Sequence, residues 1–367
     1  AGRIPLAPMA LALLDGWNAE RIGGCFDDGP YHPKPLDEAE RRILKTAQGK
    51  EIESKEQPAA IRNEYPEWME DLLRARFGDR LEAEMRAAID AATTDLRVNT
   101  LKATPVEAIA ALKAEGIKAL PTRISPVGLS VHGRPPLANL QCFKDGLIEV
   151  QDEGSQLVAL LVDAKPGQRV VDFCAGAGGK TLAIAAQMKN KGKIFACDVL
   201  QGRVDRAAVR FNRAGIFNVE RKGLSSERDP WVKRHAGDFD RVLVDAPCTG
   251  TGTWRRNPDA KWKLSPQDLE ELTALQRRIL DSACRLVKPG GRLIYATCSL
   301  LAEENEAQIA HFLSHHEEFK LLPLPYVWFD AIGGTPPEEG AMLSLTPARH
   351  GTDGFFAAIL ERQKAAA

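Results

Sequence analysis

The stretch of sequence that decides the fold is a glycine-rich loop, Asp172-Phe173-Cys174-Ala175-Gly176-Ala177-Gly178-Gly179-Lys180-Thr181. The apolar run of residues 169–173 leads into this loop and predicts a buried strand, and the residues after the loop predict a helix. Glycines between a strand and a helix let the backbone N–H groups approach a bound ligand closely. The loop therefore predicts a ligand site at the carboxyl end of a strand in an α/β sheet.

Two common phosphate-binding loops can be compared with this stretch. A P-loop needs glycine where Cys174 stands, and the dinucleotide fingerprint needs glycine where Thr181 stands, so both patterns fail. An acidic strand end followed by small residues and glycines instead suits S-adenosylmethionine, whose amino-acid tail the loop backbone can approach. Asp198 comes twenty residues after Gly178, directly after the predicted strand of residues 193–197, where a carboxylate is expected to bind ribose hydroxyls.

The rest of the chain falls into three predicted regions. From residue 148 to 367, strands and helices alternate, with further strands expected at residues 239–245, 291–296 and 354–360; this pattern predicts a doubly wound, mostly parallel sheet. Residues 93–147 predict a small α+β unit. Residues 1–92 predict a helical region.

Local signals support helices in these first two regions. Apolar spacing predicts a helix around residues 36–44 and another over residues 81–92, and Pro66 fits the first turn of a helix between them. Thr104-Pro105 followed by Glu107 is typical of a capped helix start inside the α+β unit.

Two short cysteine motifs end predicted strands fifty residues apart, Asp245-Ala246-Pro247-Cys248 and Ala296-Thr297-Cys298-Ser299. Because parallel strands present their carboxyl ends at one edge of a sheet, two thiols and a carboxylate are expected together there. Such a set indicates covalent catalysis on an electron-poor ring. Most free cysteines are core residues instead, and that role is expected for Cys25, Cys142, Cys197 and Cys284.

Composition narrows the class of protein. The 367 residues, 44% hydrophobic and 27% charged, are typical of soluble domains, and no apolar run of about 18 residues predicts a membrane span. Seven cysteines without a C-x-x-C pair argue against a disulfide scaffold or a zinc ribbon. We therefore expect no metal, no membrane partner, a reducing cytoplasmic location and a monomer.

Basic residues supply two candidate contacts for nucleic acid, although the net charge of −1 does not itself indicate binding. One group fits an RNA-binding face or a solvated helix equally well: Arg203, Arg206, Arg210 and Arg213, which recur at helical spacing, and Arg221 and Lys222, which follow them. The other group adjoins the first cysteine motif, which favours contact with RNA at the entry to the pocket: Arg255, Arg256, Lys261 and Lys263.

Together these stretches resemble the bacterial Sun/Fmu-type RNA cytosine-5 methyltransferases, relatives of the nucleolar proliferation-antigen methyltransferases, and most of all their branch acting on 16S rRNA. The similarity runs from about Leu96 to the C-terminus. Besides the glycine loop and the cysteine motifs, the matching segments are residues 97–102, 150–156, 303–305 and 353–356, and Asp198 with Arg203.

The resemblance implies a Rossmann-like class I methyltransferase with a seven-stranded sheet and S-adenosylmethionine as cofactor. The cofactor-binding residues it implies are Cys174, Ala175, Gly176, Ala177, Gly178, Gly179, Lys180, Asp198, Arg203 and Asp245. For catalysis, it implies that Cys298 attacks C6 of cytosine, which activates C5 to accept the methyl group. Asp245 would bond near N3 and the exocyclic amine, Cys248 would assist release, and Lys180 would orient the base or lower a thiol pKa.

Three other functions stay open at this point. A tRNA cytosine keeps the same chemistry, whereas an RNA-binding assembly factor with a degenerate site would need none of it. A small-molecule methyltransferase accounts for neither the two cysteines nor the basic loop. The presence of both cysteines, Asp245 and Lys180 argues against a degenerate site.

The sequence departs from the family pattern in two places. Family members often have an aspartate that contacts the adenine amino group, but Leu224 stands near that position, and the backbone or Ser225 is left to replace it. Members acting on 16S rRNA usually carry a longer N-terminal domain similar to the antitermination factor NusB. The resemblance therefore makes residues 1–92 a candidate for the truncated end of such an RNA-binding domain.

Overall fold

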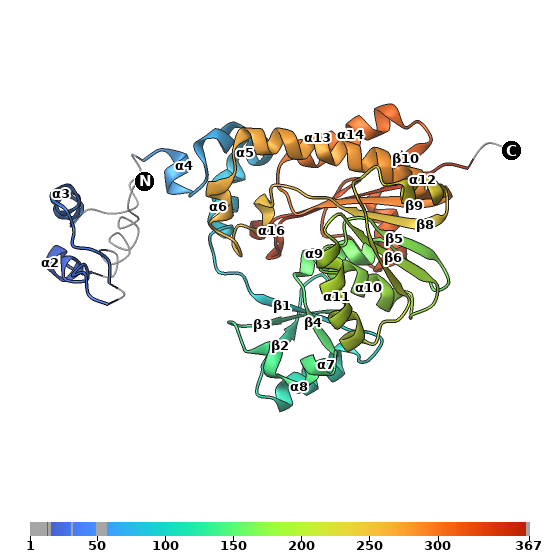
Figure 1. Ribbon diagram of the computed structural model, residues 1–367, viewed down its shortest axis with the longest axis horizontal. Helices are drawn as coiled ribbons and strands as arrows, with labels where there is room; N and C mark the ends of the chain where they lie inside the picture. Colours follow the sequence, from blue (N-terminus) through green and yellow to red (C-terminus); the bar gives the residue numbers. More distant parts are fainter. Residues whose placement is uncertain (1–12, 14–15, 31, 49–56, 365–367) are drawn as a thin grey trace. The chain divides into compact units, whose positions relative to one another are not determined.

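The structure is a computed structural model that describes residues 13, 16–30, 32–48 and 57–364 (Figure 1). It divides into two compact units, Ala1–Glu64 and Tyr65–Ala367, which are described separately. Residues 1–12 and 49–56 of the predicted helical region lie outside the described part of the chain. None of the described helices has the length and apolar character that a membrane crossing requires.

The described residues of the first unit include three short helices, α2 (Ala19–Gly23), α3 (Glu38–Ala47) and α4 (Ala59–Arg62). Helix α3 confirms the helix predicted around residues 36–44. Asp37 caps it, because its side chain accepts a hydrogen bond from the Glu40 N–H while the Glu40 carboxylate accepts one from the Asp37 N–H. A small apolar core joins α2 and α3: Ile22, Phe26, Leu36 and Leu44.

Helices also open the second unit: η1 (Glu67–Met69), α5 (Glu70–Phe77), η2 (Gly78–Arg80) and α6 (Leu81–Ala87). The helix predicted over residues 81–92 is shorter than expected, because the chain turns after Ala87 towards the first strand. Arg76 bonds to Glu306 at 2.8 Å, and Glu84 accepts a 2.9 Å hydrogen bond from the Thr346 hydroxyl. These helices therefore pack on the larger unit, and the observed division after Glu64 differs from the boundary predicted at residue 92.

A four-stranded antiparallel sheet follows, in the order β2-β3-β1-β4. Its strands are β1 (Thr94–Val98), β2 (Ala119–Pro121), β3 (Gly128–Val131) and β4 (Ile148–Val150). Its helices are α7 (Pro105–Ala114), η3 (Leu137–Asn139) and α8 (Gln141–Lys144). Leu96, Leu112 and Leu129 are fully buried in its own core. Thr104 and Glu107 cap α7 reciprocally, as the sequence predicts.

The large sheet has the order β10-β12-β9-β8-β5-β6-β7, and β11 pairs with β12 as an eighth strand. Strands β5 to β9 run parallel to one another, whereas β12 pairs antiparallel with β9, β10 and β11. The strands are β5 (Arg169–Asp172), β6 (Lys193–Asp198), β7 (Val219–Gly223), β8 (Phe239–Asp245), β9 (Val287–Thr297), β10 (Phe319–Leu321), β11 (Leu343–Leu345) and β12 (Phe355–Arg362). The strand order reverses at β5, which pairs with β6 on one side and β8 on the other, and this reversal places a ligand site at the carboxyl ends of these strands.

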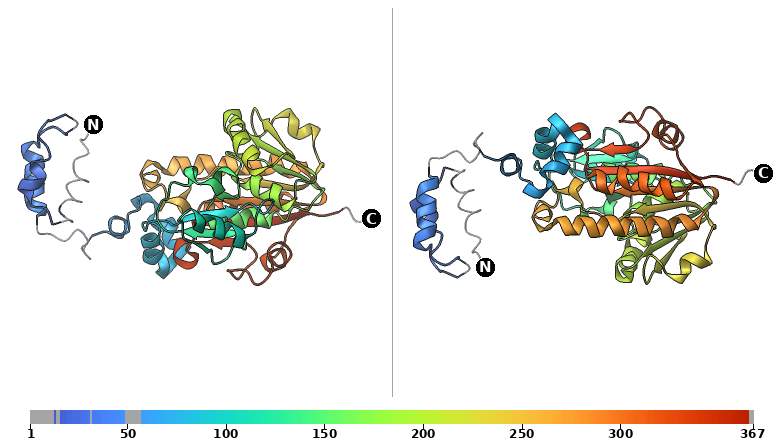
Figure 2. Two further views of the ribbon diagram at one scale, coloured as in Figure 1. Left: turned by 90° about the horizontal axis from the view of Figure 1, so that it is seen from below. Right: turned by 90° about the horizontal axis from the view of Figure 1, so that it is seen from above.

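Helices cover both faces of this sheet (Figure 1). One apolar core lies under α9 (Glu153–Leu161), α10 (Gly179–Gln187), α11 (Gln201–Ala214) and α15 (Leu324–Ala331). The opposite core lies under α12 (Pro230–Arg234), α13 (Pro266–Ala283) and α14 (Glu306–His315). Figure 2 shows α13, the long orange helix, from above. The remaining short elements are η4 (Thr251–Thr253), η5 (Ala260–Lys263), η6 (Cys284–Leu286), η7 (Ala302–Glu304) and α16 (Pro347–His350).

The two cores follow from alternation along the central strands. In β5, Val170 belongs to the first core and Val171 to the second; in β8, Leu243 belongs to the first and Val244 to the second. Because successive side chains of a strand point to opposite faces, a continuously apolar strand indicates a sheet covered on both sides. The predicted doubly wound α/β class is confirmed.

Candidate active site

The glycine loop connects β5 to α10 and owes its shape to backbone conformations that favour glycine. Gly176 and Gly178 have φ angles of 52° and 78°. A Cβ atom at Gly178 would lie 2.7 Å from the Phe211 ring, so no larger residue fits without a shift of the helix that carries Phe211. The Ala175 N–H donates to the Cys197 carbonyl at 2.8 Å, which ties the loop to the neighbouring strand.

Asp198 lies beside this loop at the end of β6. Its carboxylate accepts hydrogen bonds from the Gly176 N–H at 2.9 Å and the Leu200 N–H at 2.8 Å. The Arg203 guanidinium lies over Gly176: a Cβ atom at Gly176 would be 3.6 Å from Arg203 Nη2. The structure thus brings together the loop, Asp198 and Arg203, although the sequence places them on three different elements.

Asp172 is a buried acid at the start of the loop to which the sequence analysis gave no role. Its Oδ2 accepts a 2.7 Å hydrogen bond from the Thr181 hydroxyl, whereas Oδ1 is buried without a partner. Burial, with a further contribution from the charge of Asp245, raises the pKa of Asp172 to about 7. The strand-end position of an acid was visible in the sequence, but its complete burial and its orphaned oxygen were not.

Lys180 and Asp245 form the polar centre of the site. Lys180 Nζ lies 2.7 Å from Asp245 Oδ2, which joins the first turn of α10 to the end of β8. Burial works against the charge of Lys180, but Asp245, helped by the nearby Cys298, raises the Lys180 pKa above its usual range. The Lys180 ammonium also lies 5.2 Å from the centre of the Phe355 ring.

The two motif cysteines meet as the strand-end argument predicts. Cys248 Sγ and Cys298 Sγ are 3.5 Å apart, and both side chains are partly exposed. The hydrogen bond to Cys298, together with burial, raises the pKa of the Cys248 thiol well above its usual range. Cys298 is also fixed through its backbone, since its carbonyl accepts a 2.9 Å hydrogen bond from the Gly252 N–H. Two thiols, a carboxylate and a buried ammonium therefore share one edge of the sheet.

The remaining loop residues form the wall around this edge. Cys174 is half-buried and packs against the second apolar core, and the Ala177 carbonyl accepts a 2.6 Å hydrogen bond from Arg210. From the small sheet, Arg97 donates to the Gly179 carbonyl at 2.8 Å and also bonds to the Gln151 side chain. The α+β unit is thus attached directly to the glycine loop.

Residues 159–361 match the family described as the 16S rRNA methyltransferase RsmB/F, and residues 65–138 match its RsmF/B-like ferredoxin-like domain. The chain is 35% identical to the probable ribosomal RNA small subunit methyltransferase B of Synechocystis sp., over 81% of this chain and 67% of that protein. The chain belongs to the RsmB/F methyltransferase family. It therefore has the fold of a family of RNA methyltransferases that use S-adenosylmethionine. The chain spans about two thirds of the length of the Synechocystis protein.

Solved structures share this RsmB/F fold. A methyltransferase homologue from Pyrococcus horikoshii superposes with a TM-score of 0.70 at 30% identity, covering 83% of this chain and 97% of that one. NSun6 from Pyrococcus horikoshii, solved with SFG, has the same fold with a TM-score of 0.72 at 22% identity, covering 82% of this chain and 98% of that one. The match to the ferredoxin-like domain of the family covers the helices that open the second unit and strands β1, β2 and β3 of the small sheet.

Leu224, at the departure from the RsmB/F pattern, is buried and contributes its backbone to the sheet. Its side chain is 4% exposed, and its N–H donates to the Asp198 carbonyl at 2.9 Å. Ser225 is engaged elsewhere, because its N–H and hydroxyl donate to Asp229 at 2.8 and 2.9 Å. The backbone hydrogen bonds from Ser225 and Trp231, with a smaller contribution from the Ser225 hydroxyl, lower the pKa of Asp229 to about 2. Ser225 is therefore not a ready substitute for an adenine-contacting aspartate.

The basic residues after the first cysteine motif differ from the exposed entry loop that we expected. Arg255 bonds to Asp353 at 2.5 Å, and its side chain is only 8% exposed. Arg256 bonds to Asp353 at 2.5 Å and to Asp152 at 2.9 Å. Lys261 is 2% exposed. A buried or paired cation has little charge left to attract phosphate. These side chains therefore attach the loop to the protein core and are poorly placed to bind RNA.

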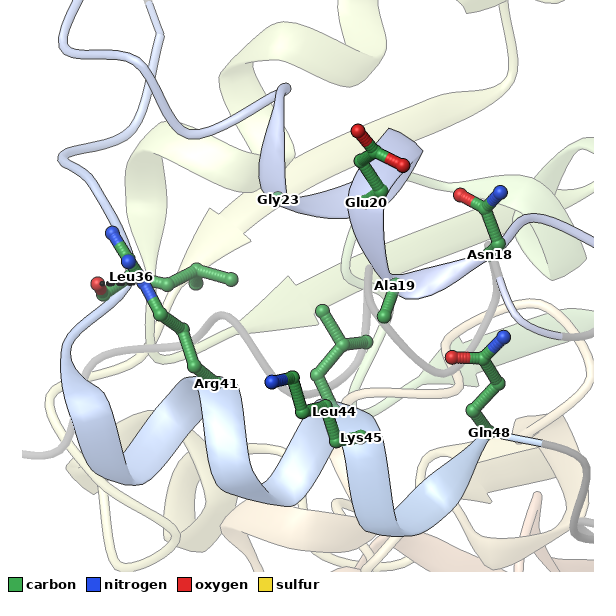
Figure 3. Close-up of a pocket in the computed structure, with 9 residues that line it drawn as sticks. All are labelled: Asn18, Ala19, Glu20, Gly23, Leu36, Arg41, Leu44, Lys45 and Gln48. Atoms are coloured by element: carbon green, nitrogen blue, oxygen red, sulfur yellow. Dashed lines mark hydrogen bonds between the residues drawn. The ribbon is translucent and has the colours of Figure 1, made fainter.

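Two other features involve none of the residues assigned to catalysis. In the helical group of basic residues, Arg210 and Arg213 pair with Glu149 at 3.4 and 2.6 Å. A cavity of about 600 Å³ in the first unit lies between α2 and α3 (Figure 3). Its lining includes Arg41, Lys45 and Glu20 but none of the residues assigned to catalysis. Among the described residues, no group of three or more His, Cys, Asp or Glu side chains could hold a metal ion.

Proposed function

We propose that the chain transfers the methyl group of S-adenosylmethionine to C5 of a cytosine in 16S rRNA, through a covalent bond between Cys298 and C6. The observation that carries this proposal is the 3.5 Å separation of the Cys248 and Cys298 sulfur atoms beside the Lys180–Asp245 pair. The names of the relatives, ribosomal RNA small subunit methyltransferase B, support the choice of substrate.

The residues around the glycine loop fit the cofactor. The backbone at Gly178 has no room for a Cβ atom, Asp198 is fixed at the end of β6, and Asp172 Oδ1 is a buried acceptor without a partner. An acceptor of this kind suits the amino group of the cofactor, and Asp198 suits the ribose hydroxyls. When bound, the cofactor supplies a sulfonium-activated methyl group as the electrophile.

The chain's own groups account for the remaining steps. Attack of the Cys298 thiolate on C6 forms a carbon–sulfur bond and makes C5 electron-rich, so that C5 can take the methyl group. Lys180 orients Asp245 through Oδ2, and Asp245 Oδ1, which has no hydrogen-bond partner among the described residues, is free for N3 and the exocyclic amine of the base. Charge that develops on the ring is stabilised by this preformed pair.

The final step removes the C5 proton and breaks the Cys298–C6 bond, which restores the aromatic ring. Cys248 is suited to this step because of the cause of its raised pKa. The hydrogen bond to Cys298 is the largest cause of that raised pKa. Once the Cys298 sulfur is bonded to C6, this hydrogen bond no longer favours the protonated form of Cys248. The pKa of Cys248 then falls, and more of Cys248 is present as the thiolate, the only form of its sulfur that can accept the C5 proton.

Bisulfite sequencing after incubation with S-adenosylmethionine tests this function. Small-subunit rRNA and bulk tRNA from a strain that lacks the gene serve as parallel substrates. We expect one protected cytosine in 16S rRNA and none in tRNA. Protection of a cytosine in tRNA alone would make tRNA the substrate in place of 16S rRNA. Protection in neither RNA would overturn the proposed function.

A further inference from the structure

The carboxylate of Glu304 connects the two cysteine loops from behind. Glu304 is fully buried, at 0% exposure. Its Oε1 accepts a 2.9 Å hydrogen bond from the N–H of Thr249, the residue after Cys248. Its Oε2 accepts from the hydroxyl of Thr249 and from the hydroxyl of Ser299, the residue after Cys298. One carboxylate thus holds the residue that follows each thiol.

Two neighbouring side chains extend this connection. Gln276 is also 0% exposed, and its Nε2 donates to Glu304 Oε1 at 3.0 Å and to the Pro247 carbonyl at 2.9 Å. The peptide before Cys248 is therefore held by the same cluster as the peptide after it. The Thr251 hydroxyl lies 3.1 Å from the Ser299 hydroxyl and gives a second bridge between the loops.

The position of Glu304 is itself fixed. The Tyr295 hydroxyl donates to the Glu304 carbonyl at 2.7 Å, and the Asn305 side chain donates to the Ser299 carbonyl at 2.9 Å. All the described hydrogen-bond donors to the Glu304 carboxylate are neutral groups. A buried carboxylate without a cationic partner is costly, and several short hydrogen bonds are needed to offset that cost. Such a group therefore holds its donors in one defined geometry.

On the basis of the proposed function, we propose that Glu304 is a positioning residue that sets the distance between the Cys248 and Cys298 thiols. None of the described hydrogen bonds of its carboxylate goes to a reacting sulfur atom or to the cofactor loop. Its effect passes through Thr249 and Ser299, each bonded in sequence to one of the two cysteines. Cys248 can act on the base only if its sulfur lies close to the sulfur that Cys298 bonds to C6, so loss of this connection slows catalysis without changing cofactor affinity.

The thiol distance can be measured without RNA or methyl donor. Phenylarsine oxide bridges two neighbouring thiols: two arsenic–sulfur bonds form, and the oxygen leaves as water with both thiol protons. We expect the wild-type protein to bind one equivalent that a monothiol does not displace, and Cys248→Ser to lose this binding. Glu304→Ala is expected to weaken arsenical affinity about tenfold or more, the scale of a misplaced reacting group.

Matched variants separate positioning from folding. Glu303→Ala removes the neighbouring acid, whose side chain makes no described hydrogen bond, and is expected to bind the arsenical as the wild type does. Glu304→Gln keeps the shape and one acceptor and should recover most of the affinity. If Glu304→Ala does not fold, Thr249→Val with Ser299→Ala removes both hydroxyl donors and should weaken arsenical binding in the same direction.

The rate of methylation gives a second test that is independent of arsenical binding. In Glu304→Ala, kcat is expected to fall about 10- to 100-fold while the Kd for S-adenosylhomocysteine stays unchanged. Folded Glu304→Ala protein that binds the arsenical as tightly as the wild type would overturn the inference. Wild-type protein that binds the arsenical but methylates no cytosine would overturn the proposed function and leave the effect of Glu304 on the thiols intact.

Discussion

Lys180 Nζ and Asp245 Oδ2 lie 2.7 Å apart, and this pair joins the cofactor loop to the catalytic edge of the sheet. Lys180 is the second residue of α10, and Asp245 is the last residue of β8 and lies three residues before Cys248. One buried ammonium therefore orients the carboxylate that we propose as the contact to the base, and it also lies near the Cys298 thiol. Geometry of this kind is fixed before the substrate arrives, which is what electrostatic catalysis requires.

Lys180→Met should slow methyl transfer more than it weakens cofactor binding. The variant keeps the length of the side chain but leaves Asp245 without its partner, and removal of one preorganised donor typically costs about 100-fold or more in rate. Single-turnover transfer of labelled methyl groups measures the effect. Lys191→Met, an exposed lysine beyond the same helix, is the control. Equal rates in Lys180→Met and the wild type would show that the pair has no catalytic role.

Asp198→Ala should weaken S-adenosylhomocysteine binding by about 1–3 kcal/mol, the cost of leaving buried polar groups unsatisfied. Calorimetry measures this change, and Asp205→Ala, which removes a half-exposed acid from α11, is the matched control. Because Asp198 also holds the Gly176 N–H, a loosened loop contributes to the loss. Unchanged affinity would remove Asp198 from the cofactor site.

Asp172 makes the stability of the cofactor-free protein depend on pH. Burial raises its pKa from 3.8 to about 7, so the folded protein keeps this proton in a range where the unfolded chain has released it. This proton therefore stabilises the folded protein. The stabilisation is fully present below about pH 4 and is lost as the pH rises through about 7. Asp172→Asn removes that dependence. Thermal unfolding midpoints at pH 5 and pH 8 should therefore differ less in Asp172→Asn than in the wild type; an equal difference in both proteins would contradict the assignment.

Arg255 should matter for stability and not for the salt dependence of RNA binding. Its side chain is 8% exposed and pairs with Asp353 and Asp152, so Arg255→Met leaves two buried carboxylates short of positive charge and should cost about 3 kcal/mol. Lys263→Met breaks an exposed pair with Asp259 and should leave the free energy of unfolding nearly unchanged. Urea unfolding measures both changes. Wild-type stability together with a flatter salt slope for RNA would restore Arg255 as a phosphate contact.

The sequence predicted those parts of the site that depend on one strand and the loop after it. The glycine loop, Asp198 and both cysteine motifs all lie at strand ends, and parallel topology brings strand ends together whatever the details of packing. The helix starts at Thr104 and Asp37 were equally local, because a capping box needs only neighbouring residues.

Other parts of the site depend on contacts between distant segments, and no local pattern encodes them. Arg255 looked like an exposed basic residue because the acids that pair with it are about a hundred residues away in the sequence. Glu304 lies in residues 303–305, which match the family pattern, but the sequence predicted no role for it. Its partners lie on the Thr249 loop and on α13. The division after Glu64 was missed for the same reason, because the helices from Glu67 to Ala87 gain their partners only after the chain returns.

The central claim is that Cys298 attacks the base and Cys248 assists its release, and trapping of the covalent adduct tests it most directly. Each single alanine variant is incubated with RNA and S-adenosylmethionine and run on a denaturing gel. We predict that Cys248→Ala accumulates a protein–RNA adduct that needs the cofactor to form, because attack and transfer proceed while release fails. Cys298→Ala should form none. An adduct in Cys298→Ala and none in Cys248→Ala would assign the nucleophile to Cys248 and contradict the account.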